Sequence, residues 1–187
     1  MARILIVYES KYGQTEKIAK FIVNRMLSQG HSVNLMNLRT KDLQSPANYE
    51  GIIVGGGVYM RSYPKSLVKW VQENSRNLSQ KPTAFFSVCL AVMQNDLRTQ
   101  RDLHLIENNF FKKTKWFPKR REAFAGALSY SKYGWLTKRV MKLMAQSRGG
   151  DSDTSRDYEY TSWKDVSRFS DNFVNSLRQM SNEMHAP

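Results

Sequence analysis

The chain has 187 residues, of which 41% are hydrophobic and 24% are charged. This length suits one well-buried domain, residues 1–187, and the composition is typical of a soluble globular protein. No apolar run approaches the roughly 18 residues of a membrane-spanning helix, and the N-terminus lacks the pattern of a signal peptide. The single cysteine, Cys89, excludes an internal disulfide framework and fits a reducing compartment, and three scattered histidines predict no metal site.

The net charge of +13 is large, and it is unevenly distributed along the chain. Residues 97–148 contain thirteen Lys and Arg residues but only three acidic ones. A concentrated positive field attracts an anionic small molecule, an anionic membrane surface or nucleic acid. The charge alone leaves these three classes of partner open.

Apolar segments alternate along the chain with segments of helical periodicity. Strands are predicted at Ile4–Tyr8, Ser32–Asn37, Gly51–Gly55, Pro82–Val88 and Ala123–Leu128. Helices are predicted after residue 15, from Pro64, over Arg98–Lys112 and after Thr161. Strands that alternate with helices form a parallel sheet covered on both faces, and right-handed crossovers favour the strand order 2-1-3-4-5. Ligands of such α/β folds bind beyond the carboxyl ends of the strands.

The loop after the first strand has the chemistry of a phosphate-binding site. It comprises Ser10, Lys11, Tyr12, Gly13, Gln14 and Thr15, and it leads directly into the first helix. Free backbone N–H groups and the positive end of the helix dipole point into such a loop. Gly13 lets the backbone approach an oxyanion, and the hydroxyls of Ser10 and Thr15 can donate to it. The other interpretation is that Ser10 or Thr15 only caps the helix.

Two further loops are predicted at the same edge of the sheet. The third strand runs into Gly55-Gly56-Gly57-Val58-Tyr59, which suits either close approach to a flat ligand or a purely structural turn. Tyr59 would supply an aromatic face for that ligand. The fourth strand ends in Ser87, Val88, Cys89 and Leu90. Cys89 is interpreted as a small buried or ligand-adjacent thiol rather than a nucleophile. We predict one ligand site that includes Gly56, Gly57, Val58, Tyr59 and these four residues.

About thirty residues, 129–160, separate the last predicted strand from the last helix, where a short loop would suffice. Their first half predicts an amphipathic helix with an apolar face of Leu136, Val140, Leu143 and Met144. Basic residues Lys138, Arg139 and Lys142 lie largely off that face, and Trp135 lies at one end. A basic amphipathic helix of this kind either lies in a membrane interface or packs its apolar face on the domain. A polar loop from Ser147 to Ser155 follows the helix.

Two resemblances extend this interpretation. The pattern Ser10-x-Tyr12-Gly13-x-Thr15 resembles the phosphate loop of flavodoxin-like proteins, which holds the FMN phosphate without a basic residue and often has Thr at the position of Tyr12. Nearly the whole chain resembles the quinone-dependent protoporphyrinogen IX dehydrogenases of bacterial haem biosynthesis. The segments that carry this resemblance are Gly13–Thr15, Ala84–Val88, Trp116–Pro118, Ala125–Tyr130, Arg139–Met144 and Gly149–Ser155. The chain departs from that family at Cys89, where Asn is typical, and at residues 93–96, where a basic run is typical.

The resemblance implies a flavodoxin-like doubly wound sheet with a basic helical insert before the last helix. It implies FMN as the cofactor, protoporphyrinogen IX as the substrate, and menaquinone or ubiquinone as the electron acceptor. A cytoplasmic protein bound peripherally to the inner face of the cell membrane would reach that acceptor, with an anionic membrane surface as its partner. FMN carries the redox chemistry, and we identify no catalytic acid–base pair. Substrate or membrane contacts are expected from Tyr133, Trp135, Lys138, Arg139 and Lys142.

Two alternatives compete with this function. A flavodoxin-type electron carrier or a soluble NAD(P)H–quinone reductase would share the fold, but a carrier is expected to be acidic where it docks. A basic module that binds nucleic acid would need exposed aromatic residues among the basic ones, and Trp116, Tyr133 and Trp135 are the candidates. We expect no nucleic-acid partner.

Overall fold

The computed structural model describes residues 1–40, 44–93, 96–146 and 150–184. Its strands are β1 Arg3–Glu9, β2 Ser32–Asn37, β3 Gly51–Gly57, β4 Thr83–Val88, β5 Arg120–Phe124, β6 Ala127–Leu128 and β7 Tyr158–Glu159. Its α-helices are α1 Gln14–Ser28, α2 Lys65–Ser79, α3 Leu97–Thr114, α4 Trp135–Gln146 and α5 Trp163–Met184. Short 3-10 helices lie at Pro46–Asn48, Leu90–Met93 and Tyr130–Lys132.

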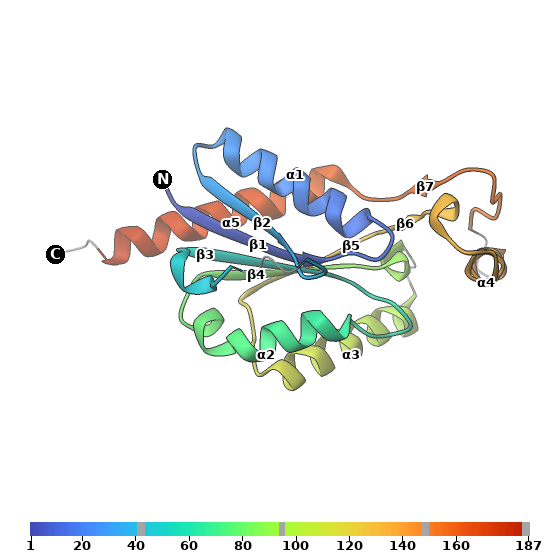
Figure 1. The fold of residues 1–187 in the computed structure, drawn as a ribbon, viewed down its shortest axis with the longest axis horizontal. Coiled ribbons are helices and arrows are strands. Elements are labelled where there is room, and N and C mark those ends of the chain that lie inside the picture. Colours follow the sequence, from blue (N-terminus) through green and yellow to red (C-terminus); the bar gives the residue numbers. More distant parts are fainter. Residues whose placement is uncertain (41–43, 94–95, 147–149, 185–187) are drawn as a thin grey trace.

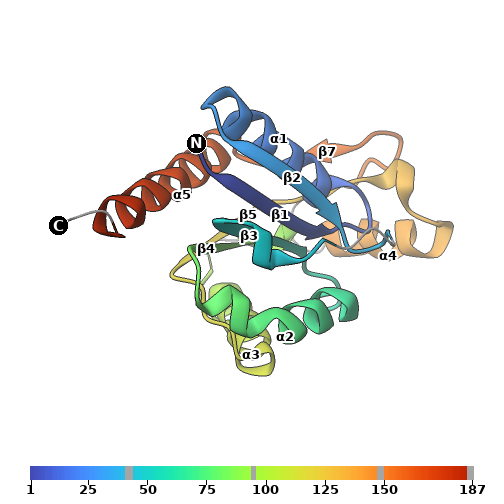
Figure 2. The same cartoon turned by 60° about the vertical axis from the view of Figure 1, so that its left-hand side comes forward.

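Five parallel strands form a sheet in the order β2-β1-β3-β4-β5, which confirms the predicted topology. Helices α1 and α5 cover one face of this sheet and α2 and α3 cover the other (Figures 1 and 2). The central strand β1 explains the continuous apolar run at the N-terminus. Its Ile4 and Ile6 pack in the core beside α1 and α5, whereas Leu5 and Val7 pack beside α2 and α3. A strand buried on both faces needs no polar alternation.

The glycine run of β3 has a different role from the predicted one. Gly55, Gly56 and Gly57 belong to the strand and are buried, so β3 extends two residues beyond the expected Gly55. A methyl group added to Gly55 would lie 2.1 Å from Cζ of Phe86, and one added to Gly56 would lie 2.4 Å from Cδ2 of Leu67. These glycines allow side chains to pack on the strand, so the prediction of an open glycine loop for a flat ligand was wrong.

The predicted strand Ala123–Leu128 is two strands in two sheets. β5 begins at Arg120 on the edge of the main sheet, where polar side chains on exposed positions do not disturb the core. The chain then leaves that sheet at Ala125 and Gly126, and β6 pairs antiparallel with β7. The predicted strand began too late, because β5 starts with charged residues. It ended too late, because the apolar residues of β6 follow directly in the sequence.

The insert, residues 129–160, extends beyond the carboxyl end of the main sheet, where α4 lies apart from the other helices (Figure 1). It has a small core of its own, in which buried Leu128, Tyr130 and Ala145 contact half-buried Met141 and Tyr158. No helix in the described part of the chain has both the length and the hydropathy to span a membrane. The side chain of Met144 and all of residues 147–149 lie outside the described residues, as do Gln94 and Asn95.

Candidate functional site

The loop between β1 and α1 enters the helix through a glycine in the left-handed region. Gly13 is the N-cap of α1 with φ of +100°, and no side chain caps the helix. Ser10 instead accepts a hydrogen bond from the Gly13 N–H group at 3.0 Å, which stabilises the loop itself. Thr15 is 1% exposed in the first turn. The alternative that Ser10 or Thr15 only caps α1 was therefore wrong, and the loop retains the geometry of an anion site.

The phenol oxygen of Tyr59 shows where the donors of this loop converge. It accepts a hydrogen bond from the Lys11 N–H group at 3.0 Å. Burial raises the pKa of Tyr59, while hydrogen bonds from the Lys11 and Tyr12 amides and from the Thr15 hydroxyl lower it. The Lys11 amide is thus directed at this oxygen atom, as it would be at a phosphate oxygen in the same place. The described residues therefore fit the phosphate of a flavin mononucleotide, provided that Tyr59 moves aside.

The carboxyl ends of β3 and β4 lie next to each other, as predicted. The Val58 N–H group donates to the Val88 carbonyl at 2.9 Å, and the Cys89 N–H group donates to the Phe124 carbonyl at 3.0 Å. Val58, Tyr59, Cys89 and Leu90 are half-buried and line this end of the sheet. Gly56, Gly57, Ser87 and Val88 are buried within the strands, and ligand contact at these four residues stays a prediction.

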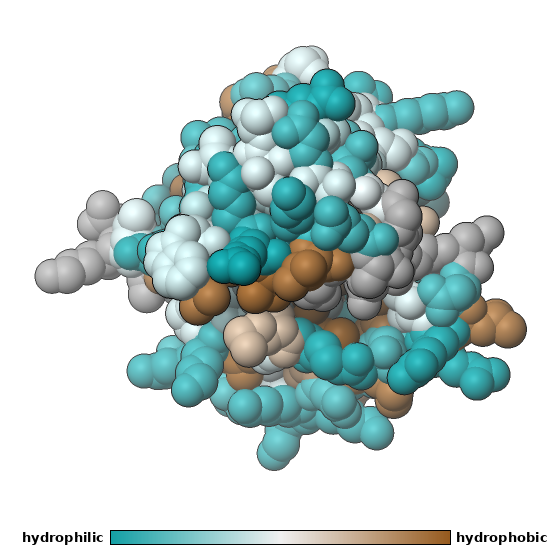
Figure 3. All heavy atoms as spheres, turned by 90° about the vertical axis from the view of Figure 1, so that its right-hand side faces the viewer, coloured by the Kyte–Doolittle hydropathy of each residue, from teal (hydrophilic) through white to brown (hydrophobic). Residues whose placement is uncertain are grey.

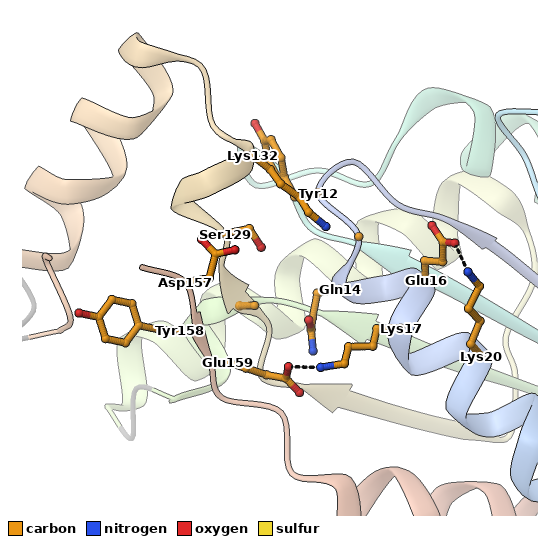
Figure 4. Close-up of a pocket in the computed structure, with 12 residues that line it drawn as sticks. Tyr12, Gln14, Glu16, Lys17, Lys20, Ser129, Lys132, Asp157, Tyr158 and Glu159 are labelled. Carbon is orange, nitrogen blue, oxygen red and sulfur yellow. Dashed lines mark hydrogen bonds and ion pairs between the residues drawn. The ribbon is translucent and has the colours of Figure 1, made fainter. Parts of the chain in front are cut away.

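The insert packs against the loop between β1 and α1, which was predicted to bind phosphate. The Tyr133 ring meets the Tyr12 ring edge-on with centroids 4.7 Å apart. Directly after the insert, the Thr161 hydroxyl accepts a hydrogen bond from the Gln14 side-chain amide at 2.8 Å. A cavity of about 530 Å³ lies between Tyr12 and Gly13 on one side and the insert on the other (Figure 4). Tyr133 was predicted to contact substrate or membrane, but its ring packs on the loop, and burial raises the pKa of its phenol to about 12.

The basic and apolar residues of α4 are oriented outward. Arg139 and Lys142 are exposed, Lys138 is half-buried, and Trp135 is 76% exposed. The predicted apolar face does not pack on the domain, because Leu136 is 60% exposed and Leu143 is 62% exposed. Met141 and Ala145 make the contact with the insert core instead.

The sequence analysis did not single out a carboxyl group that lies next to the end of β4. Glu107 of α3 accepts a hydrogen bond from the Ser87 hydroxyl at 3.2 Å. Burial raises the pKa of Glu107, against smaller lowering effects of Ser87, Arg121 and His104. Its helical spacing from the buried pair Phe110 and Phe111 was the available signal, since i, i+3 and i+4 positions share one face.

A family model described as a flavodoxin domain matches residues 5–155. The chain belongs to the flavodoxin domain family. This membership implies a flavin cofactor, and the cradle around the Tyr59 oxygen is consistent with that. The main sheet with its flanking helices also resembles solved flavodoxins, among them oxidised Flavodoxin 2 from Bacillus cereus, with a TM-score of 0.57 and 18% identity, covering 94% of this chain and 99% of that one.

Relatives within this flavodoxin family also carry a specific name. The chain is 27% identical over 167 residues to the protoporphyrinogen IX dehydrogenase [quinone] of Escherichia coli K12, covering 89% of this chain and 92% of the relative. A protein of the same name from Leishmania major is 24% identical over 173 residues, covering 92% and 74% respectively. The resemblance predicted from the sequence motifs is confirmed by these relatives. A flavodoxin from Clostridium saccharobutylicum is 36% identical over 92 residues, 48% of this chain and 58% of the relative.

Proposed function

We propose that this protein is an FMN-dependent dehydrogenase that oxidises protoporphyrinogen IX to protoporphyrin IX and passes the electrons to a membrane quinone. The observation that carries the proposal is the position of a basic, amphipathic insert directly beside the phosphate loop, in a chain whose relatives bear this enzyme's name. A small flavodoxin needs no such insert, because its loop between the last strand and last helix can be short.

In this proposal the FMN phosphate takes the place of the Tyr59 oxygen. The amides of Lys11 and Tyr12 and the hydroxyl of Thr15 would donate to it, and Gly13 would allow its close approach. Val58, Cys89 and Leu90 are the residues best placed toward the flavin ring, because they line the end of β3 and β4. Bound FMN would supply the redox chemistry, and these residues would hold and orient it.

The substrate and the electron acceptor make different demands on the insert. Protoporphyrinogen IX carries propionate groups, which the basic residues Lys138, Arg139 and Lys142 suit by charge. A quinone is dissolved in the bilayer, so the enzyme must approach the membrane surface. Trp135, Leu136 and Leu143 are 76%, 60% and 62% exposed, and they lie on the same short helix as these cations.

We therefore propose that α4 lies on an anionic membrane surface, on the cytoplasmic side. Figure 3 faces the end of the molecule that carries α4, and hydrophobic side chains gather there within a mostly hydrophilic surface. Apolar side chains beside basic ones are the pattern of a helix that binds in a membrane interface. Nucleic acid is a poorer partner, because Trp116, one of the three aromatic candidates, is only 1% exposed.

Anaerobic turnover is the decisive experiment. The FMN-loaded protein is mixed with protoporphyrinogen IX, with and without menaquinone or ubiquinone in vesicles, and porphyrin fluorescence is followed. Each porphyrin requires three two-electron reductions of the flavin, so porphyrin should accumulate beyond about one third of an equivalent per flavin only when quinone is present. Failure to form porphyrin, together with reduction of quinone by NAD(P)H, would instead support a quinone reductase. Electron exchange with a reductase but neither reaction would support a flavodoxin-type carrier.

Charge reversal of Lys138, Arg139 and Lys142 to Glu tests the basic part of the insert. Turnover should fall several-fold at low ionic strength, and the effect should shrink above about 0.1 M salt, where the Debye length is about 10 Å. Reduction of the bound flavin by a small neutral reductant should not change. Sedimentation with anionic vesicles then separates loss of membrane binding from loss of substrate binding.

A further inference from the structure

Lys132 is the insert residue that reaches the phosphate loop. It ends the short 3-10 helix Tyr130–Lys132, and its ammonium group lies so close to Gly13 that a methyl group added there would be 2.7 Å from Nζ. Lys132 lines the same cavity as Tyr12 and Gly13 (Figure 4). A cation from a segment more than a hundred residues away is thus placed over the N-terminus of α1.

The other lysines around this loop already contact a carboxylate or an aromatic ring. Lys17 forms an ion pair with Glu159, and Lys20 forms one with Glu16 at 2.6 Å (Figure 4). Lys11, in the loop itself, lies over the Tyr12 ring, 5.3 Å from its centroid. Among the described residues, Lys132 alone of the three lysines that line the cavity is paired with no carboxylate.

The turn that presents Lys132 is held on both sides. Asp157 accepts hydrogen bonds from the Ser131 N–H group at 2.8 Å and from the Ser131 hydroxyl at 2.6 Å. These hydrogen bonds lower the pKa of Asp157, so the carboxylate is ionised and a stronger acceptor at neutral pH. On the other side, Tyr133 packs against Tyr12. Lys132 is exposed, and its neighbours position its ammonium group beside Gly13.

We propose that Lys132 is a ligand of the cofactor's phosphate and makes the site select FMN over riboflavin. The inference rests on the FMN cofactor of the proposed function. A phosphate monoester carries nearly two negative charges, and amides with one hydroxyl neutralise them only in part. An ammonium group beside Gly13 would add a charge-assisted hydrogen bond to the phosphate that riboflavin, which lacks the phosphate, cannot form.

The origin of Lys132 in the insert has a second consequence. If the phosphate attracts Lys132, cofactor binding also stabilises the turn that leads into α4. Linkage is reciprocal, so an ordered insert must strengthen FMN binding by the same factor. Riboflavin should not produce this coupling, because it offers no charge to the lysine.

The test compares FMN and riboflavin affinities, measured by quenching of flavin fluorescence, in the wild type, Lys132→Gln and Lys132→Arg. Lys132→Gln should weaken FMN binding about tenfold, the order expected for one charge-assisted hydrogen bond, and leave riboflavin binding unchanged. Lys132→Arg should retain most of the FMN affinity. Lys20→Gln is the matched control, since it removes a lysine of the same cavity that is already paired. It should change neither affinity by more than about twofold.

Limited trypsin digestion gives an independent readout at Lys138, Arg139 and Lys142. FMN should slow cleavage in α4 of the wild type, riboflavin should not, and Lys132→Gln should abolish the difference. Equal losses of FMN and riboflavin affinity in Lys132→Gln, or no loss of either, would overturn the assignment while leaving the enzyme's proposed activity intact. A wild type that binds no FMN would overturn both. Failure to oxidise protoporphyrinogen IX by a protein that passes the flavin test would overturn only the proposed function.

Discussion

The phosphate loop and the helix α4 lie at the same end of the molecule but are supported in different ways. The loop connects a central strand, in which Ile4–Val7 are completely buried, to a helix whose inner face is also buried. Helix α4 contacts only a small core through Met141 and Ala145, and most of its large apolar side chains are exposed. The loop is thus held between tightly packed elements, whereas α4 buries few of its side chains.

This difference suggests two kinds of recognition. The loop presents backbone amides, whose positions are set by the sheet and tolerate many changes of side chain. Helix α4 presents exposed side chains, and their proposed role depends on a membrane surface outside the chain. Binding of the cofactor should therefore be sensitive to backbone conformation, and function of the insert should be sensitive to the identity of exposed residues.

The largest expected effect concerns the exposed leucines of α4. The double variant Leu136→Ser, Leu143→Ser should bind anionic vesicles about a hundredfold more weakly, because burial of each leucine in the membrane contributes roughly 1.5 kcal/mol. Sedimentation with vesicles measures this affinity. Turnover with quinone in vesicles should fall, whereas turnover with a water-soluble quinone analogue should persist. Leu105→Ser on α3 is the control, since Leu105 is also 55% exposed. Unchanged vesicle binding in the double variant would contradict the proposed membrane contact of α4.

The next effect tests the backbone of the loop. Gly13→Ala should weaken FMN binding about tenfold, or about 1.4 kcal/mol, because the added methyl group would occupy the space beside Gly13 through which the phosphate approaches and would lie 2.7 Å from Nζ of Lys132. Gly30→Ala is the matched control: Gly30 has φ of +82°, and a methyl group there would meet nothing within 4 Å. Urea denaturation should show similar losses of stability in both variants, whereas flavin titration should show a loss in the first alone. Equal flavin affinities would mean that the ligand does not approach Gly13.

A smaller effect of opposite sign is expected at Tyr59. Tyr59→Phe removes the oxygen that accepts the Lys11 N–H group at 3.0 Å, so the phosphate no longer displaces a hydrogen bond. FMN affinity should rise a few-fold, in line with about 0.5–1.5 kcal/mol for one hydrogen bond. Flavin titration and stopped-flow association measure the change. Weaker binding in the variant would show that the Tyr59 hydroxyl contacts the cofactor rather than competing with it.

The smallest effect is a pH dependence that does not involve α4. Burial raises the pKa of Glu107 above its ordinary value of 4.5, so the folded protein holds this proton more tightly than the unfolded chain. Its contribution is most favourable below pH 4.5 and is lost as pH rises through the raised pKa. Glu107→Gln should be more stable than the wild type at pH 7.5, and the difference should vanish near pH 4. Glu73→Gln on the exposed side of α2 should show no such trend in urea denaturation.

The order of the main sheet and the position of the loop between β1 and α1 could both be predicted from the sequence. Both depend on local patterns: an apolar run in β1, helical spacing in α1 and a glycine between them. The register of β5 was less accessible, because an edge strand carries charges such as Arg120 and Arg121 that obscure its pattern. The helix of the insert was also predicted, since amphipathic periodicity needs no knowledge of neighbours.

The contacts that these elements make could not be predicted from the sequence. The glycines of β3 accommodate Phe86 and Leu67, the apolar side chains of α4 stay exposed, and Lys132 lies over Gly13. Glu107 likewise acquires its raised pKa from burial behind Ser87. Each of these features depends on residues that are far apart in the chain and meet only after folding. Periodicity along a chain reports which face of an element is apolar, but not which partner, if any, covers that face.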